Sequence, residues 1–289
     1  MDPMITRRTL LGAGGLALLS PLFAGCSDMP TMTMPTGDGT MAQAGDMTMK
    51  PVTSTSLAAG KPVDFAFQIV RDRKPFTDFV EDMTKKMHFY AVRSDLTGYQ
   101  HVHPEMAADG TWNTKLEALE PGTWRFYTAF VGNRDGNHTN YILGHEVSVE
   151  GSMTPVSLPA PATTAQVDGY TLTLADNKFT SDMYNEQNIK VSITKDGMAV
   201  MDLEPYLGAL AHLTAIRAGD MTMAHMHPKD MAMGSSPSQK TGMVLRGRAE
   251  DPTLTIEAMF PKDGDWRLFL QFQTMGMLHL AEFTLHVTK

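Results

Sequence analysis

The chain has 289 residues, enough for two domains that each bury a core. Its formal net charge is −8, with acidic and basic residues interspersed, which argues against nucleic acid or an anionic membrane surface as a partner. Methionine is unusually frequent at 24 residues, whereas there is one cysteine, so disulfides within the chain, Cys-ligated zinc and blue-copper sites are not expected.

Residues 1–26 have the build of an export signal. Two arginines in "TRRTLL" precede an apolar stretch and the small residues of "LFAGC", and the stretch is too short for a permanent membrane span. "LFAGC" resembles a lipoprotein cleavage box, in which Cys26 becomes the lipidated first residue, and "TRRTLL" resembles a twin-arginine signal. The segment therefore predicts a protein that is anchored by lipid to the outer face of the cytoplasmic membrane.

Residues 27–52 are rich in Met, Thr, Gly, Pro and Asp and have no periodic apolar pattern. This composition predicts a disordered tether between the lipid and the folded body. Its methionines lie in polar sequence that offers no apparent core to fill, and exposed thioethers suit soft ions such as Cu(I) or Ag(I).

The folded body contains two copies of one domain sequence. "DRKPFTDFVEDMTKKMHFYAVRSDLTGYQHVHP" (72–104) and "DGMAVMDLEPYLGALAHLTAIRAGDMTMAHMHP" (196–228) align without a gap at an offset of 124 positions. Further along, "EPGTWRFYTAF" (120–130) matches "KDGDWRLFLQF" (262–272) at an offset of 142. We infer a tandem duplication, with extra residues inserted in the second copy.

Each copy contains short runs of aromatic and branched residues separated by turn signals. This pattern predicts an all-β protein of two tandemly duplicated β-sandwich domains of the immunoglobulin or cupredoxin type. We expect domain 1 over residues 53–151, a Pro/Ala/Thr-rich linker over 152–167 and domain 2 over 168–289. The expected core residues are Trp124, Phe126, Phe130, Trp266, Leu268, Leu270 and Phe272.

The first copy carries a possible metal site in its His-x-His-Pro strand. His101 and His103 stand two residues apart, so they point to the same side of a strand. The short turn "SDLTG" joins this strand to "MHFYAVR", and a register centred on that turn places His88 across from His103 and Tyr90 across from His101. Cross-strand neighbours are about 4.5–5.5 Å apart at Cβ, close enough for three imidazoles to bind one ion. A register slip of one residue would move His88 to the opposite face.

The second copy repeats the arrangement with His212, His225 and His227 and adds methionines. Met221 and Met223 alternate with the two later histidines, which predicts four side chains on one strand face. Neutral imidazoles suit Zn, Cu, Ni or Fe, and thioethers shift the preference toward Cu(I). The bland alternative is that these faces belong to the core and that their histidines only form internal hydrogen bonds.

"PYLGALAHLTAIRAGDMTMAHMHP" (205–228) with "GDWRLFLQF", and "MHFYAVRSDLTGYQHVHPEM" (87–106), resemble a group of exported bacterial lipoproteins with tandem His-x-His-Pro β-sandwiches. The resemblance covers both domains and not the tether. It implies a relation to copper-associated, YtkA- and CopC-like β-sandwich domains of unassigned role. It carries over to His88, His101, His103, His212, His225 and His227.

Together these features predict a lipid-anchored protein that buffers or delivers copper, with silver or zinc as other possible ions. The membrane is the expected partner through Cys26, a copper-handling protein is a possible second partner, and no nucleic acid is expected. We do not expect an enzyme. A metal-dependent enzyme using a three-histidine site stays open, with Glu105 and Asp230 as the nearby carboxylates. A structural or partner-binding lipoprotein without metal is the third reading.

Overall fold

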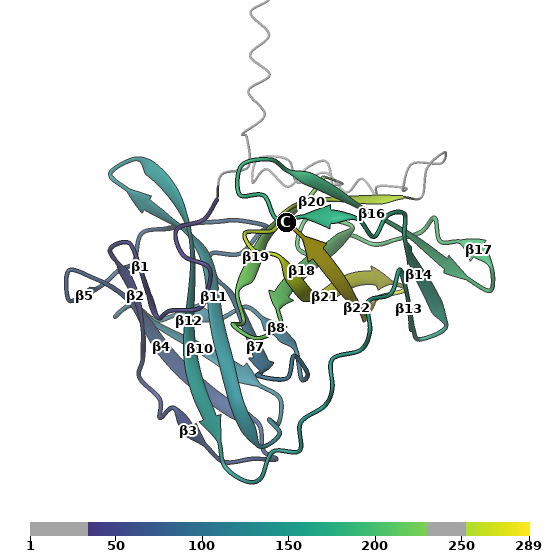
Figure 1. Cartoon of the computed structure of the whole chain (residues 1–289). Helices are drawn as coiled ribbons and strands as arrows, with labels where there is room; N and C mark the ends of the chain where they lie inside the picture. Colours follow the sequence, from purple (N-terminus) through teal and green to yellow (C-terminus); the bar gives the residue numbers. More distant parts are fainter. Residues whose placement is uncertain (1–33, 230–252) are drawn as a thin grey trace, which may run out of the picture. The chain divides into compact units, whose positions relative to one another are not determined.

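A computed structural model describes residues 34–229 and 253–289 (Figure 1). Every regular element in these ranges is a β-strand, which confirms the all-β prediction. None of the described residues forms a helix long and apolar enough to cross a membrane. Both domains belong to one compact unit that spans residues 32–289.

Domain 1 is a sandwich of two sheets, whose inner faces enclose an aromatic core. In the first sheet the order is β1-β2-β4-β10-β9, with β5 paired to β4. Its strands are β1 (Gln43–Ala44), β2 (Met47–Pro51), β4 (Val63–Arg71), β5 (Lys74–Pro75), β9 (Glu105–Met106) and β10 (Thr111–Leu116).

The second sheet of domain 1 has the order β3-β12-β11-β7-β8, with β6 paired to β11. Its strands are β3 (Ser56–Leu57), β6 (Phe79–Val80), β7 (His88–Arg93), β8 (Gln100–Val102), β11 (Gly122–Arg134) and β12 (Asn137–Val149). The predicted core residues Trp124, Phe126 and Phe130 lie on its inner face and are at most 3% exposed. Burial of such a side chain contributes roughly 1.5–3 kcal/mol, so this face holds the sandwich together.

Domain 2 repeats the same strand plan. Its strands are β13 (Thr164–Val167), β14 (Tyr170–Leu174), β15 (Phe179–Thr180), β16 (Gln187–Lys195), β17 (Met198–Ala199), β18 (Ala211–Arg217), β19 (Met223–Pro228), β20 (Leu254–Met259), β21 (Gly264–Thr274) and β22 (Met277–Thr288). The hydrogen-bonded order is β13-β14-β16-β20-β19-β18-β21-β22-β15, with β17 on β16. The predicted core residues on β21 are fully buried, so the tandem β-sandwich prediction is confirmed in both copies.

The His-x-His-Pro strand is connected differently in the two domains. In domain 2 it is the continuous β19, which pairs first with β18 and then with β20, so the two halves of the sandwich join edge to edge. In domain 1 the same stretch is divided into β8, which pairs with β7, and β9, which pairs with β10. His103 and Pro104 lie between those two short strands.

The expected tether over residues 27–52 is wrong for its second half. Met47 and Met49 alternate along β2, which pairs with β4, and both are at most 1% exposed in the domain 1 core. β1 and β2 stand in domain 1 where β13 and β14 stand in domain 2, so these methionines fill positions that hold Tyr170 and Leu172 in the other copy. Methionine packs well in a core, and the polar residues around it obscured the period-2 pattern. Residues 27–33 lie outside the described ranges.

The expected linker over residues 152–167 is also too long at its C-terminal end. Residues 164–167 form β13, which pairs with β14. The preceding residues form no strand but are held to both domains, because Val156 N–H donates to Asp95 and Ala162 N–H donates to the Thr284 carbonyl.

The two domains meet through the outer faces of corresponding sheets. Tyr99 of domain 1 stacks on Phe269 of domain 2, with ring centroids 4.2 Å apart and planes 6° apart. Tyr99 also hydrogen-bonds Thr214 at 2.9 Å, and the Tyr127 hydroxyl donates to the Met221 carbonyl at 2.8 Å. These contacts belong to a third, smaller hydrophobic cluster drawn from both domains. The face that carries His88 is therefore the domain interface and not the sandwich core.

Candidate metal centre

His88 is the first residue of β7 and is held by the loop that precedes it. Met83 and Thr84 have left-handed backbone conformations (φ 49° and 67°), and Asp82 bridges back to Lys85. This tight turn presents the Asp82 carbonyl to the ring, and His88 Nε2–H donates to it at 3.0 Å. His88 is only 5% exposed, so its orientation is set by the fold.

The hairpin has the register that its turn predicts. Tyr90 pairs with His101, and Phe89 pairs with Val102, which places His88 opposite His103. One ring nitrogen from each of His88, His101 and His103 lies within 4.8 Å of the other two. The closest pair is His88 Nδ1 and His101 Nε2, at 3.1 Å. The structure therefore brings the first predicted histidine set together.

The outer nitrogens of two of these rings are occupied as donors. His88 Nε2–H donates to a backbone carbonyl, which can only accept, so a neutral His88 has its lone pair on Nδ1. His101 Nδ1–H donates at 2.7 Å to the Gln271 side-chain oxygen of domain 2, which leaves the lone pair on Nε2. With these tautomers the lone pairs of His88 Nδ1 and His101 Nε2 face each other, and the two atoms are 3.1 Å apart. Two imidazoles on one tetrahedral ion have ligand nitrogens about 3.3 Å apart, so this pair matches a metal-binding geometry.

The third ring has an unsatisfied buried atom. Within the described part of the chain, His103 Nε2 is buried and has no hydrogen-bond partner. Buried polar atoms are normally hydrogen-bonded, so an unpartnered one marks a place where a ligand or ion can bind. Its ring centroid is 5.1 Å from that of His88 and 4.7 Å from that of His101. His103 is therefore available as the third ligand of an ion bound between His88 and His101.

Burial keeps these imidazoles neutral. Desolvation lowers the pKa of His88 and holds the pKa of His101 well below its ordinary value, and for His101 the neighbouring histidines add to the effect. Desolvation, with a smaller contribution from His88, lowers the pKa of His103 to about 3. Only the neutral ring offers a lone pair to a metal, so the cluster is in its ligating form at neutral pH.

Domain 2 supports His212 in the same way. His212 Nε2–H donates to the Tyr206 carbonyl at 2.7 Å, and a Tyr206–Ala209 bridge with left-handed Leu207 repeats the loop of domain 1. Its ring centroid lies 6.4 Å from that of His101, across the domain interface. Burial lowers the pKa of His212 to about 4. His212, from the second predicted set, is therefore a neighbour of the first set.

The other two members of the second set are described only by their backbone. His225 pairs with Met259 and His227 with Glu257, both on β20. The pairing of β19 with β18 ends at Ala224, so both histidines lie on the part of β19 that pairs with β20. The side chains of His225 and His227 lie outside the described part of the structure, so the second three-histidine site stays a prediction.

The structure places the two predicted methionine ligands differently. Met221 precedes β19 in a left-handed conformation (φ 58°), which breaks the alternation, and it is buried in the interface cluster. Met223 is also buried in that cluster, but it lines the cavity beside the histidines. Met221 is therefore an interface residue, and Met223 is the one of the two that faces the candidate site.

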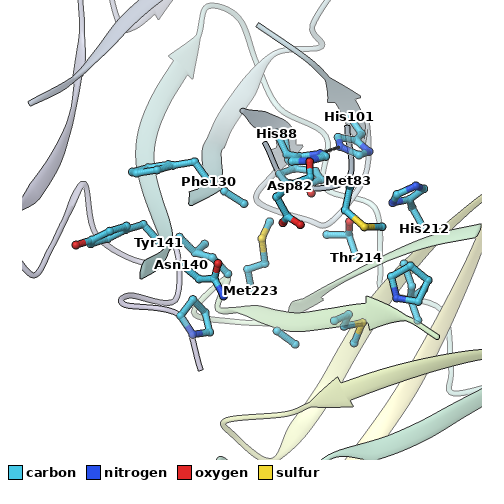
Figure 2. Close-up of a pocket in the computed structure, with 18 residues that line it drawn as sticks. Asp82, Met83, His88, His101, Phe130, Asn140, Tyr141, His212, Thr214 and Met223 are labelled. Carbon is cyan, nitrogen blue, oxygen red and sulfur yellow. Dashed lines mark hydrogen bonds between the residues drawn. The ribbon is translucent and has the colours of Figure 1, made fainter. Parts of the chain in front are cut away.

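A cavity of about 90 Å³ lies between the domains, next to this cluster. Figure 2 shows His88, His101 and His212 around it, with Met83 and Asp82 nearby. Of these, Met83 and Asp82 were missed by sequence reasoning, because their loop carries no strand period. The carboxylates expected for an enzyme are placed elsewhere: Glu105 lines a separate surface cavity with His103, and Asp230 lies outside the described residues.

These features define a tandem β-sandwich protein with a partly buried three-histidine cluster beside its domain interface. Residues 42–148 and 165–289 each match the family model described as "Domain of unknown function (DUF8832)". The chain belongs to this family, whose two copies begin at β1 and β13. No curated protein matches the chain.

Solved structures with similar topology are distant. They include InvD of Yersinia pseudotuberculosis (11% identity, TM-score 0.25), covering 84% of this chain and 57% of InvD. Salmonella alpha-2-macroglobulin reacted with methylamine has 12% identity and a TM-score of 0.28, covering 90% of this chain and 16% of that protein. Fibronectin(III)-like modules of Clostridium thermocellum CbhA have 10% identity and a TM-score of 0.20, covering 83% and 94%. This chain thus spans little more than half of InvD and a small part of the macroglobulin, and likenesses at this level carry no argument about function.

Proposed function

We propose that this protein binds copper outside the cytoplasmic membrane, where it buffers the metal or delivers it. The observation that carries the proposal is the convergence of one ring nitrogen each from His88, His101 and His103 within 4.8 Å of one another, with His88 Nδ1 and His101 Nε2 3.1 Å apart. An ion between these nitrogens would accept the lone pair of each neutral ring.

A proton is a poor substitute for the ion at this position. Protonation of either ring creates a charge in a buried site, and burial lowers the pKa of both His88 and His101. A metal ion also brings a charge into the site, but it offsets the desolvation cost by accepting three lone pairs at once. The acceptors on the far side, the Asp82 carbonyl and the Gln271 side-chain oxygen, are the kind of outer partners that orient histidine ligands in metal sites.

Copper is favoured over other ions by the neighbours of the cluster. Three neutral imidazoles suit Cu, Zn, Ni or Fe, and thioether groups favour Cu(I). Met83 and Met223 line the same cavity as His88 and His101. Silver and zinc are the alternatives. The export signal and lipidation at Cys26 would place this site on the outer face of the membrane, attached through the lipid, and residues 1–26 lie outside the described ranges.

The test is metal binding by purified protein and by a variant that lacks the first cluster, His88→Ala/His101→Ala/His103→Ala. We expect the variant to lose the high-affinity copper bound by this site, measured by competition with a chelator of known affinity. Copper should also raise the melting temperature of the wild type, because binding to the folded state stabilises it by mass action. The matched control is His286→Ala, which removes an exposed histidine paired with Asp265.

Equal copper affinity in the variant and the wild type would contradict the proposal. A melting temperature that copper leaves unchanged would favour the third reading, in which the histidines only form internal hydrogen bonds.

A metal-dependent enzyme is the second candidate, and one observation favours it. Asp82 lines the cavity beside His88 and His101, so a carboxylate lies near a site where a bound metal could activate water. In that case zinc-loaded protein should hydrolyse a p-nitrophenyl ester faster than free zinc does. Asp82→Asn should reduce the rate without reducing zinc affinity, whereas equal rates for protein and free zinc would remove this candidate.

A further inference from the structure

Gln271 of domain 2 contacts the three-histidine cluster of domain 1. It lies on β21, where it pairs with His212, and it is 6% exposed. Its side chain crosses the domain interface, and its oxygen accepts the Nδ1–H of His101 at 2.7 Å. Every other hydrogen bond described for the rings of the first cluster comes from domain 1 itself.

The position of this proton decides whether His101 can bind a metal through Nε2. A neutral imidazole has one N–H and one lone pair, and the acceptor on one side fixes which nitrogen holds which. With the proton on Nδ1, the lone pair on Nε2 points toward His88 Nδ1. With the proton on Nε2, His101 would donate to His88 Nδ1, and both groups would be unavailable to a metal.

We propose that Gln271 is a positioning residue that holds His101 in its metal-binding tautomer, so that domain 2 controls the metal affinity of the site in domain 1. This inference rests on the proposed metal-binding function. The carboxamide of Gln271 accepts a hydrogen bond through its oxygen and, turned over, donates through its nitrogen. With its oxygen toward the ring, as in the structure, the carboxamide selects the binding tautomer, and the turned-over orientation would select the other.

The residue at the position equivalent to Gln271 in domain 1 cannot form the corresponding hydrogen bond. Gln271 pairs with His212 on β21, and the residue that pairs with His88 on the equivalent strand β11 is Ala129. Alanine has no group that can reach across the interface to hydrogen-bond a histidine of domain 2. Domain 2 thus contributes an outer partner to the first site without receiving the equivalent partner in return.

Two substitutions separate the roles of this side chain. Gln271→Leu keeps the approximate size but removes the acceptor, and Gln271→Glu keeps an acceptor that cannot donate. Losing an outer partner of a histidine ligand costs about 10–100-fold in metal affinity, so we expect that loss for Gln271→Leu. Gln271→Glu should bind at least as tightly as the wild type. The control is Gln273→Leu on the same strand, which breaks a hydrogen bond to Glu204 and should leave metal affinity unchanged.

The tautomer of His101 provides a readout that does not depend on metal. In the folded, metal-free variants, the ring ¹⁵N shifts of His101 should report Nδ1–H for Gln271→Glu and Nε2–H for Gln271→Leu. Zinc serves as the diamagnetic probe for the loaded wild type, where His101 should carry its proton on Nδ1. The same tautomer in both metal-free variants would overturn the inference.

The affinity measurements distinguish this inference from the proposed function. If the variant without the three histidines loses copper but Gln271→Leu binds within about twofold of the wild type, the inference is wrong and the proposed function stands. If the three-histidine variant binds as the wild type does, the proposed function is wrong, and the inferred control of metal affinity falls with it. Melting temperatures matched to those of Gln273→Leu show that a loss of affinity is not a loss of folding.

Discussion

The two domains repeat one strand plan but differ in what surrounds the repeated histidine. His88 lies at the start of β7 and His212 near the start of β18. Each donates its Nε2–H to the backbone carbonyl of an equivalent loop residue. The neighbouring strand then differs, with Ala129 beside His88 and Gln271 beside His212. The duplicated loop carbonyl orients the histidine in both domains. The difference between Ala129 and Gln271 gives domain 2 a side chain that hydrogen-bonds a histidine of domain 1.

The second difference lies at the first position of the His-x-His-Pro strand. Tyr99 in domain 1 occupies the position of Met223 in domain 2, and both are buried at the interface. The tyrosine hydroxyl bonds Thr214 in the other domain, whereas the methionine contributes a thioether to the wall of the cavity. The two copies thus place a hydroxyl and a thioether at equivalent positions of the interface.

The largest expected effect separates the two histidine sets by stoichiometry. The proposal expects two copper sites per chain, so His88→Ala should remove one and His212→Ala the other. Loss of a ligand should weaken the affected site by more than about 100-fold, beyond the loss caused by an outer partner. Copper stoichiometry measured on each variant checks this, with His286→Ala retaining both sites. If either single substitution removed all bound copper, the two sets would form one shared site.

The next prediction compares equivalent core positions in the two copies. Met49 and Leu172 hold corresponding places on β2 and β14 and are at most 1% exposed. Truncation of a buried Met or Leu to Ala costs about 2–5 kcal/mol, so Met49→Ala and Leu172→Ala should lower the free energy of unfolding by similar amounts. Denaturant unfolding measures this, and Met41→Ala, at a residue 67% exposed, is the control. A near-zero effect of Met49→Ala would restore the tether interpretation.

Much of the fold could be predicted from the sequence, because the period-2 pattern of apolar residues and the duplication indicate the same strands. The hairpin register followed from the turn between β7 and β8, and the register in turn predicted that His88, His101 and His103 would converge. Residues 43–51 were misread because methionine is common in cores and at soft-metal sites alike. Only the pairing of β2 with β4 decides between these roles.

The rest of the candidate site could not be predicted, because it depends on how the two domains pack. Gln271 reaches His101 across the interface, and no local spacing in the sequence connects the two residues. One signal was present on β21, where Phe269 and Gln271 share the outward face of the strand. A large aromatic residue on an outward face indicates a second partner for that face. The Asp82 carbonyl is a backbone group, so no residue type marks its role.

The lowered histidine pKa values predict how stability depends on pH. Burial lowers the pKa of His103 to about 3 and that of His212 to about 4, from an ordinary value of 6.5. As pH falls below about 6.5, the unfolded chain binds protons at these residues before the folded protein does, so the free energy of unfolding decreases. The loss should develop between about pH 6.5 and pH 3, with the His212 part complete near pH 4, and be absent above that window.

Melting temperatures of metal-free protein at pH 7 and pH 4.5 test this dependence. The double variant His103→Gln/His212→Gln should lose less stability between the two pH values than the wild type, since it lacks both titrating groups. His286→Gln changes an exposed histidine and should follow the wild type. An unchanged pH slope in the double variant would mean that other groups control acid stability.

The smallest expected effect concerns the hydrogen bond between Tyr99 and Thr214, which has no counterpart from domain 2 because Met223 stands at the position of Tyr99. Tyr99→Phe removes the hydroxyl that bonds Thr214 and leaves a buried threonine oxygen without this partner, which costs about 1–3 kcal/mol. Replacing both partners in Tyr99→Phe/Thr214→Val should recover most of the loss, because neither polar group is then left unpaired. A double-mutant cycle by denaturant unfolding measures the coupling. Additive effects of the two substitutions would show that the stacking of Tyr99 on Phe269, and not its hydroxyl, holds this part of the interface.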